Sequence, residues 1–234
     1  MNVTEQLNFF WDGRAKTLED QALMPIANPN EMDLPVDSAL ARLGVDEHYQ
    51  TAFRRLFGGI PDRKSLALAI AAFERTLETA NTAFDDWRLN NNEQALSQSA
   101  KNGYALFNGK AGCIRCHFGT NFNNAEFRNI GLFDGVNLRD SGRSVITKNP
   151  SDLGKFKIAA LRNIACTAPY MHNGMFKTLR EVIDYYNDPD KIVPRPVNRD
   201  SLLKKPLGLT EQEKCDLEAF LRSLTDKRFA SGKQ

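Results

Sequence analysis

Cys113, Cys116 and His117 carry the clearest chemical signal in the sequence, as the motif Cys-Ile-Arg-Cys-His. Two thiols three residues apart can each add to a vinyl group of one porphyrin, and the adjacent histidine then becomes an axial ligand of the iron. A zinc site would need a second ligand pair of similar spacing, and a redox-active Cys-x-x-Cys would need a β-α-β context. The sequence has neither, so the motif predicts one covalently bound haem c in this chain.

The ligand opposite His117 is less well defined. Haem iron takes His, Met or Tyr in this position, or leaves it vacant. A methionine would raise the reduction potential, whereas a tyrosinate would lower it and favour higher oxidation states of iron. The residues alone leave these alternatives open. The candidates downstream of the motif are Met171, His172, Met175, Tyr185 and Tyr186.

Helical patterns surround the motif and must position it. Each predicted helix has a capping residue, a capping box or apolar side chains on one face. Pro25, Asn28, Pro29 and Asn30 are expected to end the first helix. The predicted helices are one that starts at Thr17, then 66–77, about 95–107, 178–186 and 210–224.

Two long segments, 119–153 and 189–206, are rich in polar residues, Gly or Pro, and we expect both to be irregular. No alternating strand pattern and no internal repeat is present. The sequence therefore predicts a mainly α fold, made of one or more cytochrome c-type haem domains with long irregular loops.

Length and composition limit the remaining possibilities. A chain of 234 residues with 41% hydrophobic residues can form one large domain or two smaller ones. The formal net charge is only +2, and no Lys/Arg block resembles a nucleic-acid-binding stripe. No apolar run reaches the length of a membrane span. We therefore expect neither nucleic acid as a partner nor a membrane-spanning segment.

The remaining cysteines and the first residues bear on the cellular compartment. Cys166 and Cys215 leave a single disulfide open, but the chain is not a disulfide-dense scaffold. The N-terminal residues lack the basic and apolar regions of a signal peptide. Because c-type haem is normally attached outside the cytoplasm, we expect a periplasmic protein whose given chain is mature, truncated or begins at a misassigned start.

Further blocks of sequence resemble one known family, the bacterial di-haem cytochrome c peroxidases and MauG. They cover nearly the whole chain in the order and spacing of that family. The blocks are Phe10-Trp-Asp-Gly-Arg-Ala15, Glu19-Asp-Gln-Ala22, Pro25-Ile-Ala-Asn-Pro-Asn-Glu-Met32, Ala72-Phe-Glu-Arg-Thr-Leu77, Gly109-Lys-Ala-Gly112, Leu161-Arg-Asn-Ile164 and Thr167-Ala-Pro-Tyr-Met-His-Asn-Gly174.

The resemblance implies two cytochrome c domains, each with its own haem: one haem reacts with hydrogen peroxide and the other passes electrons. Residues 1–91 would be the remainder of the N-terminal, peroxidatic domain without its haem motif. Residues 92–234 would be the C-terminal domain with its covalent haem. The one motif of this chain resembles the electron-transferring site, and we expect the first motif to lie upstream. As given, the chain would then be a poor peroxidase.

The resemblance also implies roles for individual residues. Trp11 matches a tryptophan that relays electrons between the two haems; without the resemblance it would be assigned to the core. Gln21, Pro25 and Glu31 match residues that line the peroxide pocket. The carboxylate of Glu31 would move a proton between the peroxide oxygens as the O–O bond breaks; by itself it resembles a solvated surface residue.

Two further features follow from the same resemblance. Thr167 and Pro169 match positions whose carbonyls bind a calcium ion, a hard cation that prefers oxygen ligands. Tyr186 occupies the position of the sixth haem ligand, and a tyrosine there is similar to MauG, the di-haem enzyme of methylamine utilisation. We therefore prefer Tyr186 to Met171 and Met175.

The implied function is that of a haem c oxidoreductase that reduces hydrogen peroxide, with electrons passed through the C-terminal haem. Its partners would be hydrogen peroxide and either a small electron-donor protein, such as a cytochrome or cupredoxin, or a MauG-like protein substrate. The alternative is a one-haem electron-transfer cytochrome without peroxidase activity.

Overall fold

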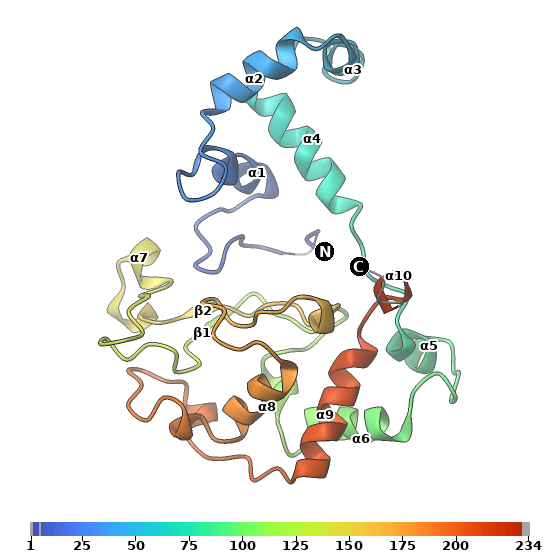
Figure 1. Ribbon diagram of the computed structural model, residues 1–234, viewed down its shortest axis with the longest axis vertical. Coiled ribbons are helices and arrows are strands. Elements are labelled where there is room, and N and C mark those ends of the chain that lie inside the picture. Colours follow the sequence, from blue (N-terminus) through green and yellow to red (C-terminus); the bar gives the residue numbers. More distant parts are fainter. Residues whose placement is uncertain (1, 5, 231–234) are drawn as a thin grey trace. The chain divides into compact units, whose positions relative to one another are not determined.

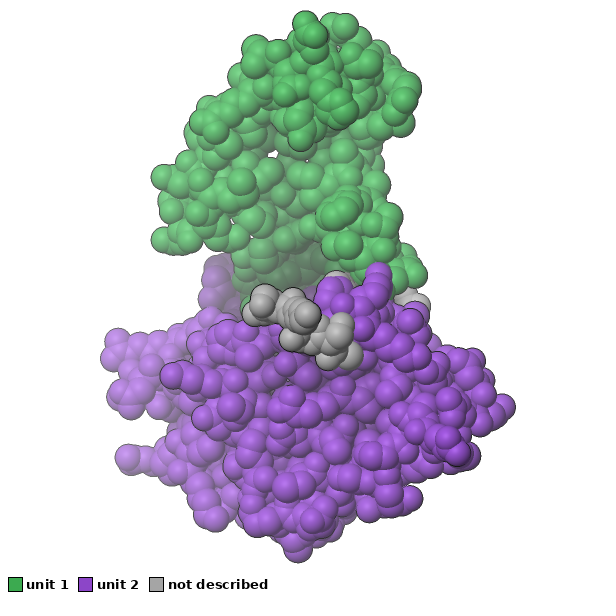
Figure 2. All heavy atoms as spheres, turned by 45° about the vertical axis from the view of Figure 1, so that its right-hand side comes forward, with its two compact units in different colours: residues 1–78 green, residues 79–234 purple. Residues whose placement is uncertain are grey.

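The computed structural model describes residues 2–4 and 6–230, and these form two compact units, 1–78 and 79–234 (Figures 1 and 2). Met1 and Glu5, which belong to the segment inspected for a signal peptide, lie outside the described residues. Helices dominate both units, which confirms the prediction of a mainly α fold. None of the helices in the described ranges has the length and apolar character needed to cross a membrane.

The unit 1–78 is built from four helices. Thr17 caps the first of them, because its side chain accepts a hydrogen bond from the Asp20 N–H at 3.0 Å. The first and last helices pack on a small core of Phe9, Ala15, Leu18 and Ala71. The helices are α1 (Leu18–Ala27), α2 (Val36–Val45), α3 (Glu47–Phe57) and α4 (Arg63–Arg75).

Pro25 was expected to help end α1, and this was wrong, because Pro25 lies inside the helix. Proline has no N–H, so the Gln21 carbonyl receives no hydrogen bond from position 25, yet α1 continues for two residues past it. The chain after α1 then folds back, and the Met32 N–H donates to the Pro25 carbonyl at 3.2 Å. The carbonyls of the last turn are thereby satisfied, and α1 ends at Ala27 beside a compact turn.

Two helices of this unit, α2 and α3, were not predicted. The carboxylate of Asp46 caps α3 by accepting from the N–H groups of His48 and Tyr49, and Gly58 ends it in the left-handed conformation. Both residues are sequence signals of helix ends. The spacing of Asp46 and Gly58 could therefore have predicted α3 from the sequence.

The unit 79–234 contains the remaining helices and a two-stranded antiparallel sheet in which Phe127 pairs with Lys157 and Arg128 with Phe156. Its α-helices are α5 (Ala83–Leu89), α6 (Gln98–Asn108), α7 (Ser144–Thr147), α8 (Leu179–Asn187), α9 (Glu211–Ser223) and α10 (Lys227–Ala230), and its strands are β1 (Phe127–Arg128) and β2 (Phe156–Lys157). Its 3-10 turns are η1 (Cys113–Arg115), η2 (Pro150–Asp152), η3 (Ile164–Cys166), η4 (Pro189–Lys191) and η5 (Ser201–Leu203).

The predicted capping box of α9 is confirmed at Thr210 and Glu213. Thr178, predicted as the first residue of a helix, instead caps α8 with a second capping box to Glu181. The segment 119–153 was expected to be irregular throughout, but it contains β1, α7 and η2. These elements are too short to leave a periodic signal in the sequence.

Helices α6 and α9 cross at very close range and enclose an aromatic core. At the crossing stands Gly103, where a Cβ atom would lie 1.9 Å from the backbone oxygen of Asp216. Only a residue without a side chain fits between the two backbones. The core beside the crossing contains the buried rings of Phe84, Phe107, Phe122 and Phe220.

The two units separate before α5, whereas the sequence suggested a domain boundary between residues 91 and 92. Helix α5 packs against α9, and its Phe84 belongs to the aromatic core of the unit 79–234. The assignment of the two parts of the chain to a peroxidatic and an electron-transferring domain stays a prediction.

Candidate haem site

The motif Cys113 to His117 forms one tight turn directly after α6. The left-handed Gly112 precedes η1, and the N–H groups of Cys116 and His117 both donate to the Cys113 carbonyl, at 3.1 and 2.9 Å. Both thiols and the imidazole therefore project from a single turn, as attachment to one porphyrin requires.

The imidazole of His117 is prepared to bind a metal through one nitrogen. Its Nδ1 lies 2.9 Å from the Phe122 carbonyl, and a carbonyl only accepts, so Nδ1 carries the proton. Burial lowers the pKa of His117, against the opposing effect of hydrogen bonds to the backbone of Phe122 and Ala159. The ring is therefore neutral, and the lone pair of Nε2 is the one suited to iron.

The carbonyl that orients His117 is itself held firmly. The ring of Phe122 is buried in the aromatic core, with only 5% of its surface exposed. Arg162 binds the same loop, since its guanidinium donates to the Thr120 carbonyl at 2.7 Å. The N–H of Leu161 donates to the Asn121 carbonyl at 3.2 Å. The loop after the motif is therefore fixed from two directions.

Arg162 is in turn anchored by a buried ion pair. It makes two hydrogen bonds of 2.8 Å with the two carboxylate oxygens of Asp85 in α5, and both side chains are more than nine-tenths buried. Such a bidentate pair has a fixed geometry. Helix α5 thus supports the histidine loop from outside the motif.

The four cysteines are all free thiols. Burial raises the pKa of the Cys113 thiol to about 12 and also raises that of Cys116. Cys166 and Cys215 are exposed and do not form the disulfide that the sequence left open.

Two adjacent tyrosines of α8 have very different surroundings. Tyr185 is fully buried, and its hydroxyl donates to the Ile130 carbonyl at 2.6 Å. Tyr186 packs against the same cluster, but its hydroxyl has no hydrogen-bond partner among the residues that the structure describes. Burial raises the pKa of Tyr186, and the thiols of Cys113 and Cys116 lie close enough to add to this effect.

The other candidate ligands are engaged elsewhere or exposed. His172 stacks on Phe156, with 3.5 Å between the ring centroids. Met175 is 37% exposed, and its sulfur lies 3.7 Å from the Asn173 amide nitrogen. Met171 packs against the cluster that contains Tyr185. Tyr186 is therefore the candidate that combines an unpartnered polar atom with nearness to both thiols.

These observations together meet what a c-type haem requires. The chain offers two thiols and an oriented imidazole on one turn, and the partly buried phenol of Tyr186 near them. Thiols, a neutral imidazole and a phenol are all groups that hold a haem or its iron. The residues present fit the group.

The residues expected at a peroxide pocket lie together around the end of α1. Gln21 and Pro25 stand four residues apart and so share one face of the helix. The turn after α1 brings Glu31 back, and its carboxylate accepts a hydrogen bond from the Asn28 side chain at 2.7 Å. Glu31 is exposed, and Gln21 and Pro25 are partly buried.

Trp11 lies at the tip of a short loop before α1. Backbone pairing between Phe9 and Ala15 closes this loop, and Arg14 stacks on Phe10 and pairs with Asp12. Because 42% of its surface is exposed, Trp11 is not a core aromatic of the unit 1–78. The loop presents the indole outward.

Thr167 and Pro169 lie in an exposed segment after η3. The hydroxyl of Thr167 donates to the Ile164 carbonyl at 3.2 Å. Within the described residues, no group of three or more His, Cys, Asp or Glu side chains is arranged for a metal ion. A calcium site at Thr167 and Pro169 would therefore depend on backbone carbonyls and stays a prediction.

Sequence reasoning missed the residues that support the site: Phe122, Asp85 and the position of Arg162 beside the motif. Phe122 acts through its backbone carbonyl, which no residue type reveals. Arg162 stands in one of the family-like blocks, so that block was the one available signal.

Comparison with known proteins agrees with this geometry. Residues 1–94 match the sequence model of a family described as di-haem cytochrome c peroxidase. The chain is 38% identical over 226 residues to the methylamine utilization protein MauG of Methylorubrum extorquens, covering 96% of this chain and 62% of that protein. It is 37% identical to the cytochrome-c peroxidase IdrP1 of Denitromonas iodatirespirans, covering 92% of this chain and 64% of that protein.

A solved structure is similar as well. A MauG-like protein associated with microbial copper homeostasis shares the fold with a TM-score of 0.80 and 33% sequence identity, over 97% of this chain and 74% of that one. The chain thus spans somewhat less than two thirds of its first two relatives, and residues 1–234 hold one Cys-x-x-Cys-His motif. On this sequence and structural similarity, the chain belongs to the family of di-haem cytochrome c peroxidases and MauG proteins.

Proposed function

We propose that this chain is a haem c oxidoreductase that takes part in the reduction of hydrogen peroxide. Cys113 and Cys116 would hold the porphyrin through thioether bonds, and His117 and Tyr186 are the residues that would bind its iron. A bound haem supplies one-electron chemistry at iron. The observation that carries this proposal is the single turn that presents Cys113, Cys116 and an oriented His117 together.

Reduction of hydrogen peroxide to two molecules of water consumes two electrons and two protons. Glu31 is the residue proposed to handle a proton, taking it from one peroxide oxygen and giving it to the other. Its carboxylate is exposed and held by Asn28, so it can exchange protons with water. Gln21 and Pro25, on the helix face beside it, would shape the pocket in which peroxide binds.

Trp11 is proposed to carry electrons toward the peroxide pocket. An indole can be oxidised and reduced by one electron, and the loop 9–15 presents this one outward. The electrons would come from a small donor protein, a cytochrome or cupredoxin, or from a protein substrate as in MauG. A tyrosine ligand, which lowers the potential of the iron, favours the second of these.

The same proposal includes a compartment and a second metal. A protein with covalent haem c and a peroxide substrate would act in the periplasm. Carbonyls of Thr167 and Pro169 would bind calcium, whose preference for oxygen ligands they meet. Removal of calcium by a chelator should then reduce activity without releasing the covalent haem.

One observation favours the alternative, a one-haem electron carrier: residues 1–234 contain a single haem motif. The two functions differ in a direct experiment. The chain is produced in the periplasm with the c-haem maturation machinery, and its intact mass and its consumption of peroxide with a reduced donor are measured. We expect one haem adduct and peroxide turnover that is poor without a second haem domain. If such a domain brings no turnover while electrons still exchange rapidly, the carrier is the correct function.

A further inference from the structure

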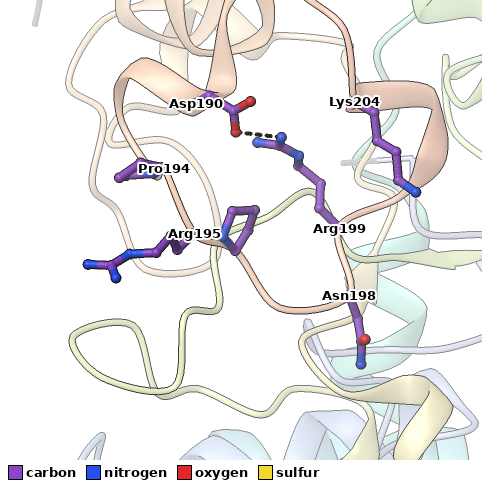
Figure 3. Close-up of a pocket in the computed structure, with 7 residues that line it drawn as sticks. Asp190, Pro194, Arg195, Asn198, Arg199 and Lys204 are labelled. Atoms are coloured by element: carbon purple, nitrogen blue, oxygen red, sulfur yellow. Dashed lines mark hydrogen bonds and ion pairs between the residues drawn. The ribbon is translucent and has the colours of Figure 1, made fainter.

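A cavity of about 510 Å³ lies in the unit 79–234 and is lined by residues of the segment 190–204 (Figure 3). Its charged residues are three cations and one carboxylate, with an asparagine and two prolines completing the wall. In Figure 3, Arg199 and Asp190 point toward each other and form the one ion pair drawn there. The charged residues are Asp190, Arg195, Arg199 and Lys204.

The guanidinium of Arg199 is the unusual group in this wall. Only 8% of its side chain is exposed, yet its Nε and Nη1 atoms are buried without a hydrogen-bond partner in the described part of the chain. Its Nη2 atom donates to Asp190 at 2.6 Å, and the Asp190 side chain is 54% exposed. A buried cation with unused donors implies an anionic acceptor that the protein does not supply.

The position of Arg199 connects the cavity to the haem site. A Cβ atom at Gly131 would lie 2.6 Å from the Arg199 Cδ and 3.1 Å from the Tyr185 hydroxyl oxygen, so the arginine stem lies near the hydroxyl of Tyr185 in α8. The Asp200 N–H donates to the Asn129 carbonyl at 2.9 Å, which holds this end of the segment against the strand β1 region.

A series of hydrogen bonds links the next residue to the haem motif. Asp200 pairs with Arg128 at 2.7 Å, and Arg128 pairs with Glu126 at 2.6 Å. The Glu126 N–H donates to the Asn124 side chain at 2.7 Å, and the Asn124 amide donates to the Cys116 carbonyl at 2.9 Å. Arg199 therefore stands between the proposed ligand helix α8 and a segment that borders the haem motif.

We propose that Arg199 binds a carboxylate, and that this carboxylate is a propionate of the haem held at Cys113 and Cys116. A propionate supplies the acceptor oxygens that Nε and Nη1 lack. The inference rests on the proposed haem attachment. A cation at a propionate favours the reduced haem, because reduction removes one positive charge from the iron.

The test uses the holo chain and compares Arg199→Gln and Arg199→Lys with Arg195→Gln, the matched control, since Arg195 lines the same cavity but is exposed. Reduction midpoints are measured by spectroelectrochemistry, and the propionate bending bands by resonance Raman. We expect Arg199→Gln to favour the oxidised haem by roughly tenfold, a downward shift of about 59 mV. Arg199→Lys should shift the midpoint less, and Arg195→Gln should leave both readouts unchanged.

The opposite results are equally clear. An unchanged midpoint and unchanged propionate bands in the Arg199 variants overturn the assignment. If Arg199→Gln does not accumulate, the propionate bands of the wild type are compared with those of Arg199→Lys. Unchanged bands in Arg199→Lys then overturn the assignment, and shifted bands support it. A free anion is tested by adding acetate: an Arg199-dependent rise in thermal stability of the wild-type holo chain assigns the site to soluble carboxylates instead. A wild-type chain without a haem adduct in its intact mass overturns the proposed function, and the assignment with it.

Discussion

The haem-motif region and the end of α1 hold their candidate residues in opposite ways. Around His117, every supporting group leads to the interior: Phe122 to the aromatic core, Arg162 to the buried carboxylate of Asp85. Around α1, Glu31 is held by one exposed hydrogen bond to Asn28, and Trp11 stands at a loop tip. Substitutions in the first region should therefore change folding and cofactor binding together. Substitutions in the second should change chemistry alone.

The largest expected difference concerns haem attachment. Replacement of Cys113 and Cys116 by alanine should abolish the covalent haem, because the motif then has no thiol to bond the vinyl groups. Replacement of Cys166 and Cys215, which are exposed free thiols, is the matched control and should leave attachment intact. Intact mass after periplasmic production measures both. A haem adduct that survives the first substitution would contradict the assignment of the motif.

The second difference concerns turnover at the α1 end. In a preparation that reduces hydrogen peroxide, Glu31→Gln should slow turnover by roughly 10²–10⁴, the usual effect of losing a general acid–base group. Its thermal stability should stay close to that of the wild type, since the carboxylate is exposed. Glu19→Gln in α1, whose carboxylate pairs with Arg75, is the control for charge. Equal rates for both variants would remove Glu31 from the mechanism.

The third difference is one of stability and pH. Burial raises the pKa of Asp85, but hydrogen bonds from Arg162 and Thr82 outweigh this effect and hold the pKa below its ordinary range. A depressed folded-state pKa stabilises the protein at neutral pH and loses this contribution as the pH falls below about 4. Asp85→Asn should cost about 3–5 kcal/mol at pH 7, the usual effect of breaking a buried ion pair.

The pH dependence makes this test specific. The difference in unfolding free energy between the wild type and Asp85→Asn should shrink as the pH is lowered, because the wild-type carboxylate is then protonated. Glu19→Gln, at a partly exposed ion pair of the unit 1–78, should show a much smaller change at either pH. A difference for Asp85→Asn that does not depend on pH would point to packing in place of charge.

The smallest expected effects separate the two tyrosines of α8. Tyr186→Phe should alter the ferric haem spectrum by opening a coordination position, with little loss of stability. Tyr185→Phe should leave the spectrum unchanged and cost about 1–3 kcal/mol, because the Ile130 carbonyl loses its buried donor. Met171→Leu and Met175→Leu are the spectroscopic controls. A spectrum that responds to one methionine and not to Tyr186 would make a His/Met site the better assignment.

Much of the fold could be predicted because its signals are local. The caps at Thr17, Thr178 and Thr210 act within three residues, and the structure has the hydrogen bonds they imply. Helix α5 was missed although Thr82 and Asp85 form a capping box, since seven residues carry little periodic signal. Pro25 misled because a proline weakens a helix without always ending it, and α1 continues to Ala27 with one backbone hydrogen bond missing.

The candidate site was predictable only in its covalent part. Cys113, Cys116 and His117 are recognisable by type and spacing. The choice of Tyr186 over Met171 and Met175 came from resemblance and stays a prediction, because no local signal in the sequence marks an iron ligand among these residues. The unpartnered, buried guanidinium of Arg199 could not be anticipated. It depends on the close approach of Gly131 to the segment 190–204, and these two parts of the chain are distant in sequence.

The hydrogen bond from His117 to Phe122 couples the packing of the aromatic core to the orientation of the imidazole. One end of Phe122 is a ring in the aromatic core, and the other is the carbonyl that orients the imidazole. The imidazole cannot keep its orientation if that ring leaves the core, so local opening of the core and loss of axial ligation form one cooperative event. Denaturation followed by haem absorbance and by aromatic circular dichroism should then give coincident transitions in the unit 79–234.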